Sequence, residues 1–202
     1  MAYLIIIAIA IIAIYLPNAL INPVNSDLPW VYYLIAIAIF VALEFVIDAL
    51  VALGIRRLVP ERCLNPKKGI LKTPDWEIRL YKKLHVDKWK KYMPDLGRFT
   101  DFQKGSLADP YNNDYLKKYI VEASYGVLIH FWSVPASLLA FLIMLIEPTN
   151  PSIWTVGAPV IVVNMILIYL PTMTLKFNLP RLIRITEIND RLAAKKGDVK
   201  ES

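Results

Sequence analysis

The chain has 202 residues, 56% of them hydrophobic, and its mean hydropathy is +0.45. That composition excludes an ordinary soluble domain of this size, in which apolar and charged residues are more evenly balanced. The single cysteine, Cys63, excludes an internal disulfide and a cysteine-rich metal cluster.

Four apolar runs are long enough, or nearly so, to cross the roughly 30 Å hydrocarbon core of a membrane. They cover about residues 3–21, 28–55, 119–146 and 152–175. The first run has no basic residue before it and no small-residue cleavage site after it, so we expect a retained helix rather than a signal peptide. The sequence therefore predicts an all-α integral membrane protein with four transmembrane helices in a single membrane domain, residues 1–202.

The basic residues are distributed very unevenly along the chain. None of the 23 Lys and Arg residues precedes Arg56; sixteen lie in segment 56–118 and seven in the tail 176–202. The other two connections, 17–29 and 147–151, contain no basic residue. By the positive-inside rule, the middle segment, the tail and both termini are cytoplasmic, in a protein of the plasma membrane. The net charge of +6 then reflects contact with an anionic membrane surface and not with nucleic acid.

The second run carries two carboxylates, Glu44 and Asp48, which share one face of the helix because they are four residues apart. Counted from the predicted cytoplasmic end near Ile55, they lie about 16 Å and about 10 Å deep. A carboxylate in a membrane is costly unless it is protonated, paired or hydrated. The pair is therefore either a structural hydrogen bond to a neighbouring helix or part of a functional site, and the sequence leaves both open.

The third run carries Glu122 and His130, which lie about 12 Å apart along the helix axis. Titratable groups inside a membrane are candidates for function by default. His130 belongs to a stripe that is otherwise made of small residues, namely Ala123, Gly126, His130, Ser133 and Ser137. Such a stripe indicates close helix packing or a groove for an alkyl chain with His130 at its wall; the two interpretations are compatible.

The cytoplasmic segment 56–118 is too patterned for a simple linker. Thr73, which a proline follows, predicts the N-cap of a helix. Trp76, Leu80 and Leu84 then recur every four residues. This spacing predicts an amphipathic helix that lies in the membrane interface.

A basic block follows that helix and contains Lys88, Trp89, Lys90 and Lys91. In one interpretation it contacts lipid headgroups. In the other it binds the phosphates of an acyl carrier or the headgroup of a glycolipid. We expect the neighbouring His85 not to be a catalyst.

The fourth run contains Asn164 and Pro171, which predicts a kink, and Asn178 and Arg181 follow at its cytoplasmic edge. We expect the polar tail after Ile188 to be mobile.

Counted by depth, these polar residues form two tiers. The buried tier, about 16 Å below the inner surface, holds His130, Glu44 and Asn164. The interfacial tier holds Glu122, Asn178, Arg181 and the segment 88–91.

Four sequence blocks resemble the glycosyl-4,4'-diaponeurosporenoate acyltransferase family. They are LVPERCLNP (58–66), KWKKYMPD (88–95), YLKKYIVEASYGVLIHF (115–131) and YLPTMTLKFNLPRL (169–182). The resemblance implies transfer of a fatty acyl group to a hydroxyl of a glycolipid or glycosylated isoprenoid at the inner membrane face.

Acyl transfer to a hydroxyl requires a base and a group that stabilises the oxyanion. We predict His130 as the general base, with Glu44 or Glu122 as its partner. Asn164, Asn178 or Arg181 would stabilise the oxyanion, and the basic block would bind the donor. The chain has no G-x-S-x-G elbow, which favours direct transfer. We predict no metal and no bound cofactor; acyl-CoA, acyl carrier protein or a lipid would be the co-substrate, and membrane lipids and a lipid-linked acceptor the partners.

Two other classes of protein fit the same residues. A small proton-coupled transporter would use the membrane carboxylates and histidine as a relay, namely Glu44, Asp48, Glu122 and His130. A non-catalytic scaffold would use them to hold its helices together. The long amphipathic segment 56–118 counts against a compact transporter.

Overall fold

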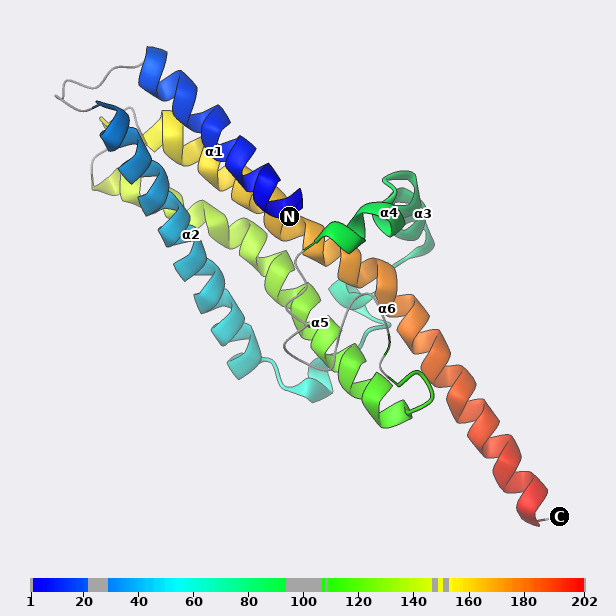
Figure 1. The fold of residues 1–202 in the computed structure, drawn as a ribbon. Coiled ribbons are helices and arrows are strands. Elements are labelled where there is room, and N and C mark those ends of the chain that lie inside the picture. Colours follow the sequence, from blue (N-terminus) through cyan, green and yellow to red (C-terminus); the bar gives the residue numbers. More distant parts are fainter. Residues whose placement is uncertain are drawn as a thin grey trace. The chain divides into compact units, whose positions relative to one another are not determined.

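The computed structural model describes residues 2–21, 29–93, 107, 109–146, 149–150 and 153–201 (Figure 1). The described residues are 87% helix and include no strand, which confirms the predicted all-α class. Most of the two connections without basic residues lies outside the described residues. The elements are α1 (Ala2–Ile21), α2 (Pro29–Leu58), the 3₁₀ helices η1 (Glu61–Cys63) and η2 (Gly69–Leu71), α3 (Asp75–Lys83), α4 (Val86–Trp89), η3 (Lys90–Tyr92), α5 (Asn113–Ala136), the 3₁₀ helix η5 (Ser137–Leu145), the π-helix η6 (Ile153–Gly157) and α6 (Ala158–Glu201).

The chain divides into two compact units. The first unit comprises residues Met1–Leu58 and Ile129–Leu170, and the second comprises Val59–Leu128 and Pro171–Ser202. The helices α5 and α6 each contribute residues to both units.

Three of the described helices are long and apolar enough to cross a membrane, not four. They are Trp30–Leu58, Asn113–Ile143 and Ile153–Lys195. The first predicted span provides the shorter apolar helix Ile5–Ile21. At 1.5 Å per residue this helix is about 26 Å long, just under the roughly 30 Å of a hydrocarbon core. The prediction of four spans is thus corrected to three spans and one shorter apolar helix.

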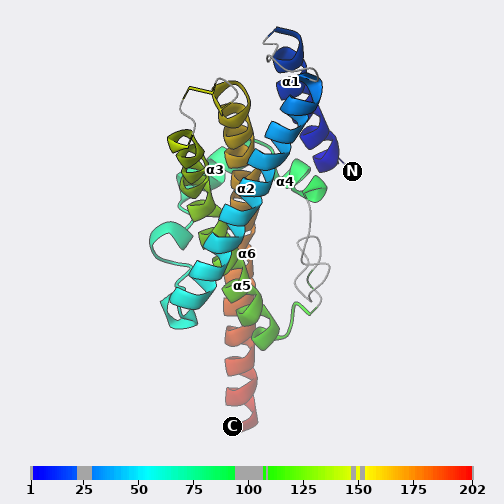
Figure 2. The ribbon, with the colours of Figure 1, turned by 90° about the vertical axis from the view of Figure 1, so that its left-hand side faces the viewer.

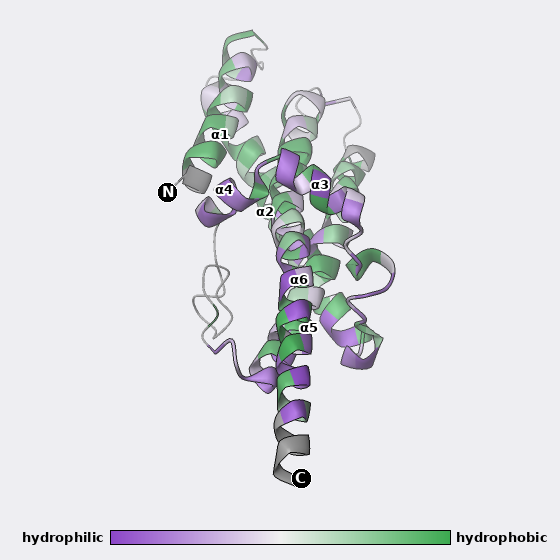
Figure 3. Ribbon diagram, turned by 90° about the vertical axis from the view of Figure 1, so that its right-hand side faces the viewer, coloured by the Kyte–Doolittle hydropathy of each residue, from purple (hydrophilic) through white to green (hydrophobic). Residues whose placement is uncertain are grey.

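The first unit has an apolar surface as well as an apolar core. α1 packs against α2 and η6, and α2 also packs against η5 (Figures 1 and 2). Large apolar side chains also point outward, and Figure 3 shows hydrophobic residues along α1 and α2. Such a surface is typical of helices that face lipid. The most buried core residues are Ile14, Tyr33, Ile37, Phe40, Ile47, Ala140, Ile153, Val156, Val160 and Ile161.

Two contacts fix η6 within the first unit. Asn18 Nδ2 on α1 donates a hydrogen bond to the carbonyl of Thr155 (2.9 Å). Gly157 lies against the ring of Phe40 so closely that a β-carbon at position 157 would be 2.4 Å from Phe40 Cζ. Only glycine therefore lets the buried Phe40 ring occupy this place.

The third predicted helix changes its geometry near Pro135. α5 ends at Ala136, and the next nine residues form the 3₁₀ helix η5. Proline has no N–H and cannot donate to the carbonyl four residues earlier, which weakens the α-helical ladder at this point.

The fourth predicted helix is much longer than expected. α6 runs from Ala158 to Glu201 and contains both Pro171 and Pro180, whereas we predicted an end near residue 175 and a mobile tail. The continuation is stabilised by packing, because Leu179 and Leu182 lie in the core of the second unit with Leu116, Tyr119 and Ala123. This packing carries the helix past residue 175, whereas residues 191–195 of the tail are exposed.

The predicted N-cap role of Thr73 is wrong. The residue before α3 is Pro74, and no side chain caps the helix. Thr73 Oγ1 instead donates a hydrogen bond to the carbonyl of Lys176 on α6 (2.9 Å). Pro180 explains this contact, because its missing N–H leaves the Lys176 carbonyl without its normal helical donor.

α3 has the amphipathic character that its spacing predicts, with its apolar stripe outward. Trp76, Leu80 and Leu84 are exposed, whereas Glu77 and Tyr81 are buried. The exposed stripe is suited to the membrane interface, where Trp is favoured.

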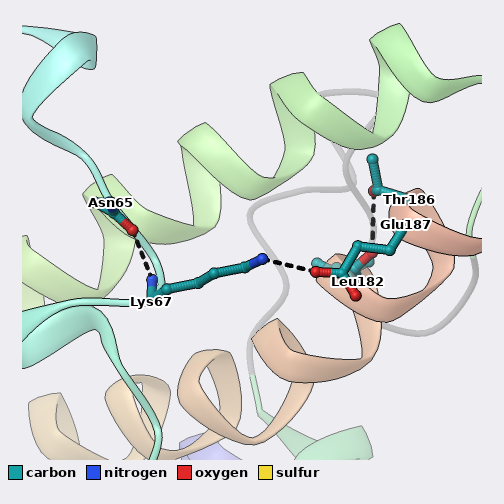
Figure 4. Close-up of polar contacts among 5 residues, drawn as sticks. All are labelled: Asn65, Lys67, Leu182, Thr186 and Glu187. Atoms are coloured by element: carbon teal, nitrogen blue, oxygen red, sulfur yellow. Dashed lines mark hydrogen bonds and ion pairs between the residues drawn. The ribbon is translucent and has the colours of Figure 1, made fainter. Parts of the chain in front are cut away.

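In the second unit, an exposed ion pair joins the segment before η2 to α6. Lys67 Nζ lies 2.6 Å from Glu187 Oε1, and the Lys67 amide donates to Asn65 Oδ1 (3.0 Å; Figure 4). The hydroxyl of Thr186 donates within α6 to the carbonyl of Leu182 (3.0 Å). An exposed pair of this kind contributes little to stability.

Candidate functional site

The predicted site residues fall into both units. Glu44, Asp48, His130 and Asn164 belong to the first unit, and Glu122, Lys88, Trp89, Lys90, Lys91, Asn178 and Arg181 belong to the second. Each group forms its own set of contacts.

The first unit brings Glu44 and Asn164 into direct contact. Asn164 Nδ2 donates hydrogen bonds to Glu44 Oε2 (2.6 Å) and to Ser137 Oγ (3.1 Å). Glu44 is 2% exposed and Ser137 is fully buried. The amide of Asn164 thus bridges α2 to η5, and its donor group is already occupied.

Asp48 lies one turn further along α2, close to Ser133 and Asn164. Within the described residues, Asp48 Oδ1, Glu44 Oε1 and Ser133 Oγ are buried without a hydrogen-bond partner. We call these five residues the carboxylate cluster: Glu44, Asp48, Ser133, Ser137 and Asn164. The sequence analysis assigned the two serines only to a small-residue stripe. Their spacing of four residues, which matches that of Glu44 and Asp48, was the signal that could have identified them.

His130 is half-buried on α5. The carboxylate of Glu44 reaches Ser137, which is seven residues further on and about 10 Å from His130 along the axis. The predicted depths placed Glu44 and His130 at the same level, which is wrong. They were counted from helix ends at residues 55 and 119. The structure has these ends at Leu58 and Asn113.

The stripe that contains His130 is closed by helix packing at Gly126. A β-carbon at this position would lie 2.8 Å from Leu175 Cδ1 of α6. Close packing of small residues is therefore the interpretation that the structure supports at Gly126. Glu122, one turn earlier, is half-buried.

In the second unit, Lys90 meets residues almost ninety positions away. Lys90 Nζ donates to Asn178 Oδ1 (2.7 Å) and lies 5.1 Å from the centre of the Phe177 ring. Burial and the nearby positive charge of Arg181 lower the pKa of Lys90, and Asp87 partly opposes this shift. We call Lys90, Phe177, Asn178 and Arg181 the Lys90 cluster.

The predicted basic block does not act as one surface. Lys88 and Lys91 are exposed, and Lys91 Nζ lies over the ring of Tyr92 (5.0 Å). Trp89 is half-buried, and its Nε1 donates to the carbonyl of Leu84 (3.0 Å), which closes the turn between α3 and α4. Of the three lysines, Lys90 is the one with described contacts to α6, through Asn178 and Phe177.

A buried ion pair next to this cluster was not predicted. Lys176 Nζ lies 2.8 Å from Glu77 Oε1, and the two side chains are only 11% and 8% exposed. The hydroxyl of Tyr81 donates to the same carboxylate oxygen. The pair could not be predicted from local patterns because Glu77 and Lys176 lie in distant parts of the chain.

Comparison with known proteins identifies a family. The family model described as glycosyl-4,4'-diaponeurosporenoate acyltransferase matches residues 66–188, more than half of the chain. No curated protein and no solved structure matches the chain. The chain therefore belongs to this family and is an acyltransferase, which favours the enzyme over the transporter and the scaffold. Among the predicted site residues, only Glu44 lies outside the match, as does the neighbouring Asp48.

The buried ion pair gives a test of how α3 is held. Changing Glu77→Gln leaves the Lys176 charge buried without a counter-charge, which typically costs about 3–5 kcal/mol. We expect a clear fall in the Tm of the purified protein in detergent, followed by tryptophan fluorescence. Removing both charges, with Glu77→Gln and Lys176→Met, should recover much of the loss.

The exposed pair in the same unit provides the matched control. Glu187→Gln removes an ion pair of similar length from a solvated position, so its Tm should barely change. Equal effects of Glu77→Gln and Glu187→Gln would contradict a structural role for the buried pair.

Proposed function

We propose that this member of the family transfers a fatty acyl group to a sugar hydroxyl of a glycolipid or glycosylated isoprenoid at the inner membrane face. The family to which the chain belongs is that of glycosyl-4,4'-diaponeurosporenoate acyltransferase, an acyltransferase acting on a glycosyl carotenoid. Three helices of membrane-spanning length and the outward apolar stripe of α3 support an acceptor that resides in the membrane.

His130 would be the general base of this reaction. It would take the proton of the acceptor hydroxyl while the hydroxyl oxygen forms the new bond to the acyl carbon. The bond from the acyl carbon to the donor then breaks, and the proton passes to the leaving group. A histidine suits this role because its pKa is ordinarily near neutrality. His130 lies within the matched residues and is only half-buried, which leaves part of its ring accessible.

The Lys90 cluster would bind the donor. Lys90 and Arg181 are both cationic and close enough for Arg181 to disfavour the charged form of Lys90. An anion between them would relieve this repulsion, and Arg181 is exposed and able to meet one. This is the observation that carries the proposal of a phosphate-bearing donor, such as acyl-CoA or the prosthetic group of an acyl carrier protein.

Oxyanion stabilisation is better assigned to Asn178 or Arg181 than to Asn164. The amide of Asn164 already donates to Glu44 and to Ser137. Asn178 accepts from Lys90 through Oδ1, and its own amide N–H groups are donors of the kind an oxyanion requires.

Replacement of single lysines tests the donor site. Lys90→Gln should raise the KM for an anionic acyl donor, whereas Lys88→Gln and Lys91→Gln, which change exposed neighbours, should leave it nearly unchanged. The pH profile adds a second readout. Because the pKa of Lys90 is lowered, Lys90 loses its charge at a lower pH than an ordinary lysine, and the donor KM should rise there. Lys90→Arg should remove this rise, since arginine stays protonated.

One outcome would contradict a specific role for the Lys90 cluster. If Lys88→Gln and Lys91→Gln raise the donor KM as much as Lys90→Gln does, the basic block acts through general charge and not through the Lys90 cluster.

Variants of His130 test the base. His130→Ala should lower kcat by the roughly 10²–10⁴-fold typical of a general base while leaving substrate binding largely intact. His130→Gln has a similar size and can form hydrogen bonds but cannot act as the base, so it should be nearly as inactive. Both must first be shown to be folded by their Tm. A folded His130→Gln variant with near-normal acyl transfer would remove His130 from the mechanism and leave Glu122 as the next candidate.

We also propose that segment 56–118 and both termini face the cytoplasm. Cys63 is the chain's single cysteine and is exposed, so it reports on this topology without engineering. A membrane-impermeant maleimide should label it only after the cells are permeabilised, and labelling of intact cells would overturn the orientation. A tag at the N-terminus tests whether α1 crosses, because three crossings alone would place that end outside.

A further inference from the structure

α3 and the segment after it are held against one short stretch of α6. Lys176 accepts a hydrogen bond from Thr73 through its carbonyl (2.9 Å) and pairs with Glu77 through its amine (2.8 Å). Two residues further on, Asn178 accepts a hydrogen bond from Lys90 (2.7 Å). α6 has no Lys or Arg before Lys176. Helices that cross a membrane carry their basic residues just outside the hydrocarbon core, so this stretch of α6 belongs at the level of the lipid headgroups.

The apolar stripe of α3 faces about a quarter-turn away from α6. Glu77 and Tyr81, the buried side chains of α3, lie on the side that meets α6. At 100° per residue, the centre of the stripe of Trp76, Leu80 and Leu84 lies about 80° round the helix from them. A helix that rests on a bilayer beside a crossing helix turns one face to that helix and another, about a quarter-turn round, to the lipid. The three exposed side chains thus form an apolar face in the direction that a bilayer would occupy.

Exposed cations outnumber exposed carboxylates around this stripe. Arg79 and Lys83 lie on α3 within about 60° of Trp76 and are exposed. Long basic side chains in such a place keep their charge among the headgroups while their stems cover apolar surface. Between residues 72 and 92, the chain exposes six cationic side chains and only two carboxylates, both aspartates, so the surface that complements it is anionic. The six are Lys72, Arg79, Lys82, Lys83, Lys88 and Lys91.

We propose that the stripe of α3, with the exposed cations around it, is a docking surface for the anionic headgroup layer of the bilayer. The apolar side chains enter the interface, and the cations bind the phosphates of anionic phospholipids. This assigns Lys88 and Lys91 to lipid, whereas Lys90 stays with the cluster on α6. The docking surface does not depend on the proposed mechanism of acyl transfer.

The full-length wild-type protein in lipid nanodiscs gives the first test. A neutral amine reagent, acetic anhydride, should modify Lys83 several-fold more slowly in discs of phosphatidylcholine with phosphatidylglycerol than in discs of phosphatidylcholine alone, as read by mass spectrometry. High salt should remove the difference. Lys195, which is exposed near the C-terminus, should react equally in both discs. Equal rates at Lys83 in the two discs, or the same slowing at Lys195, would overturn the proposal.

A fluorophore on either side of α3 tests the orientation of the stripe. Cys63 is exposed, so Cys63→Ser provides a background without other thiols. In it, an NBD label attached through Leu80→Cys should be quenched by phosphatidylcholine that carries a nitroxide in its acyl chains. The same label attached through Lys82→Cys, about 160° round the helix from the centre of the stripe, should be quenched much less. Equal quenching at the two positions in folded protein would contradict the proposal.

Paired substitutions test the cations beside the stripe. Arg79→Gln with Lys83→Gln should reduce the dependence of quenching at position 80 on phosphatidylglycerol and on salt. Arg191→Gln with Lys195→Gln is the matched control, because it removes the same charge from an exposed part of α6 and should leave that dependence unchanged. Equal effects of the two pairs would mean that only net charge matters and would overturn the docking surface. Because the first measurement uses the wild type, a variant that fails to fold does not leave the question open.

Discussion

Pro180 has no amide hydrogen, so α6 cannot satisfy the carbonyl of Lys176 within its own helix. Thr73 supplies the missing donor, and the side chain of the same Lys176 reaches Glu77 on α3. One residue of α6 thus binds the segment just before α3 through its backbone carbonyl and the first turn of α3 through its charge. These two contacts determine which face of α3 turns inward and, through the short turn that follows, bring Lys90 to Asn178.

The two units accommodate their polar and charged side chains in different ways. In the first unit, apolar side chains face outward and the polar groups of the carboxylate cluster face one another inside. In the second unit, some charged groups form the buried ion pair of Glu77 and Lys176, and others lie on the exposed side of the Lys90 cluster. In the proposed reaction, the apolar first unit would suit an acyl chain and the cations of the second unit would suit a phosphate.

Patterns within one helix were predictable from the sequence, and contacts between distant helices were not. Apolar runs and the spacing of Trp76, Leu80 and Leu84 predicted the helices and the exposed stripe. Lys90, Asn178 and Arg181 were grouped correctly because basic and amide side chains recur at predicted helix ends. The ion pair of Glu77 was not predictable because nothing near Glu77 in the sequence indicates Lys176. Ser133 and Ser137 were overlooked as site residues because a small residue in a membrane helix normally serves packing. The continuation of α6 past residue 175 was missed because Leu179 and Leu182 pack against residues far away in the sequence.

The contact between Thr73 and Lys176 also bears on when the enzyme becomes complete during synthesis. The two residues are separated by 103 positions, and Lys90 and Asn178 by 88. Contacts between residues so far apart in the sequence form slowly. During synthesis, the N-terminal parts of a chain can make their contacts before the later parts exist. α3 and the segment that follows it can therefore reach their final contacts only after the first half of α6 has been synthesised. A nascent chain that stops before residue 176 would already possess the apolar helices α1, α2 and α5 but would lack every α6 group that holds Lys90 in place.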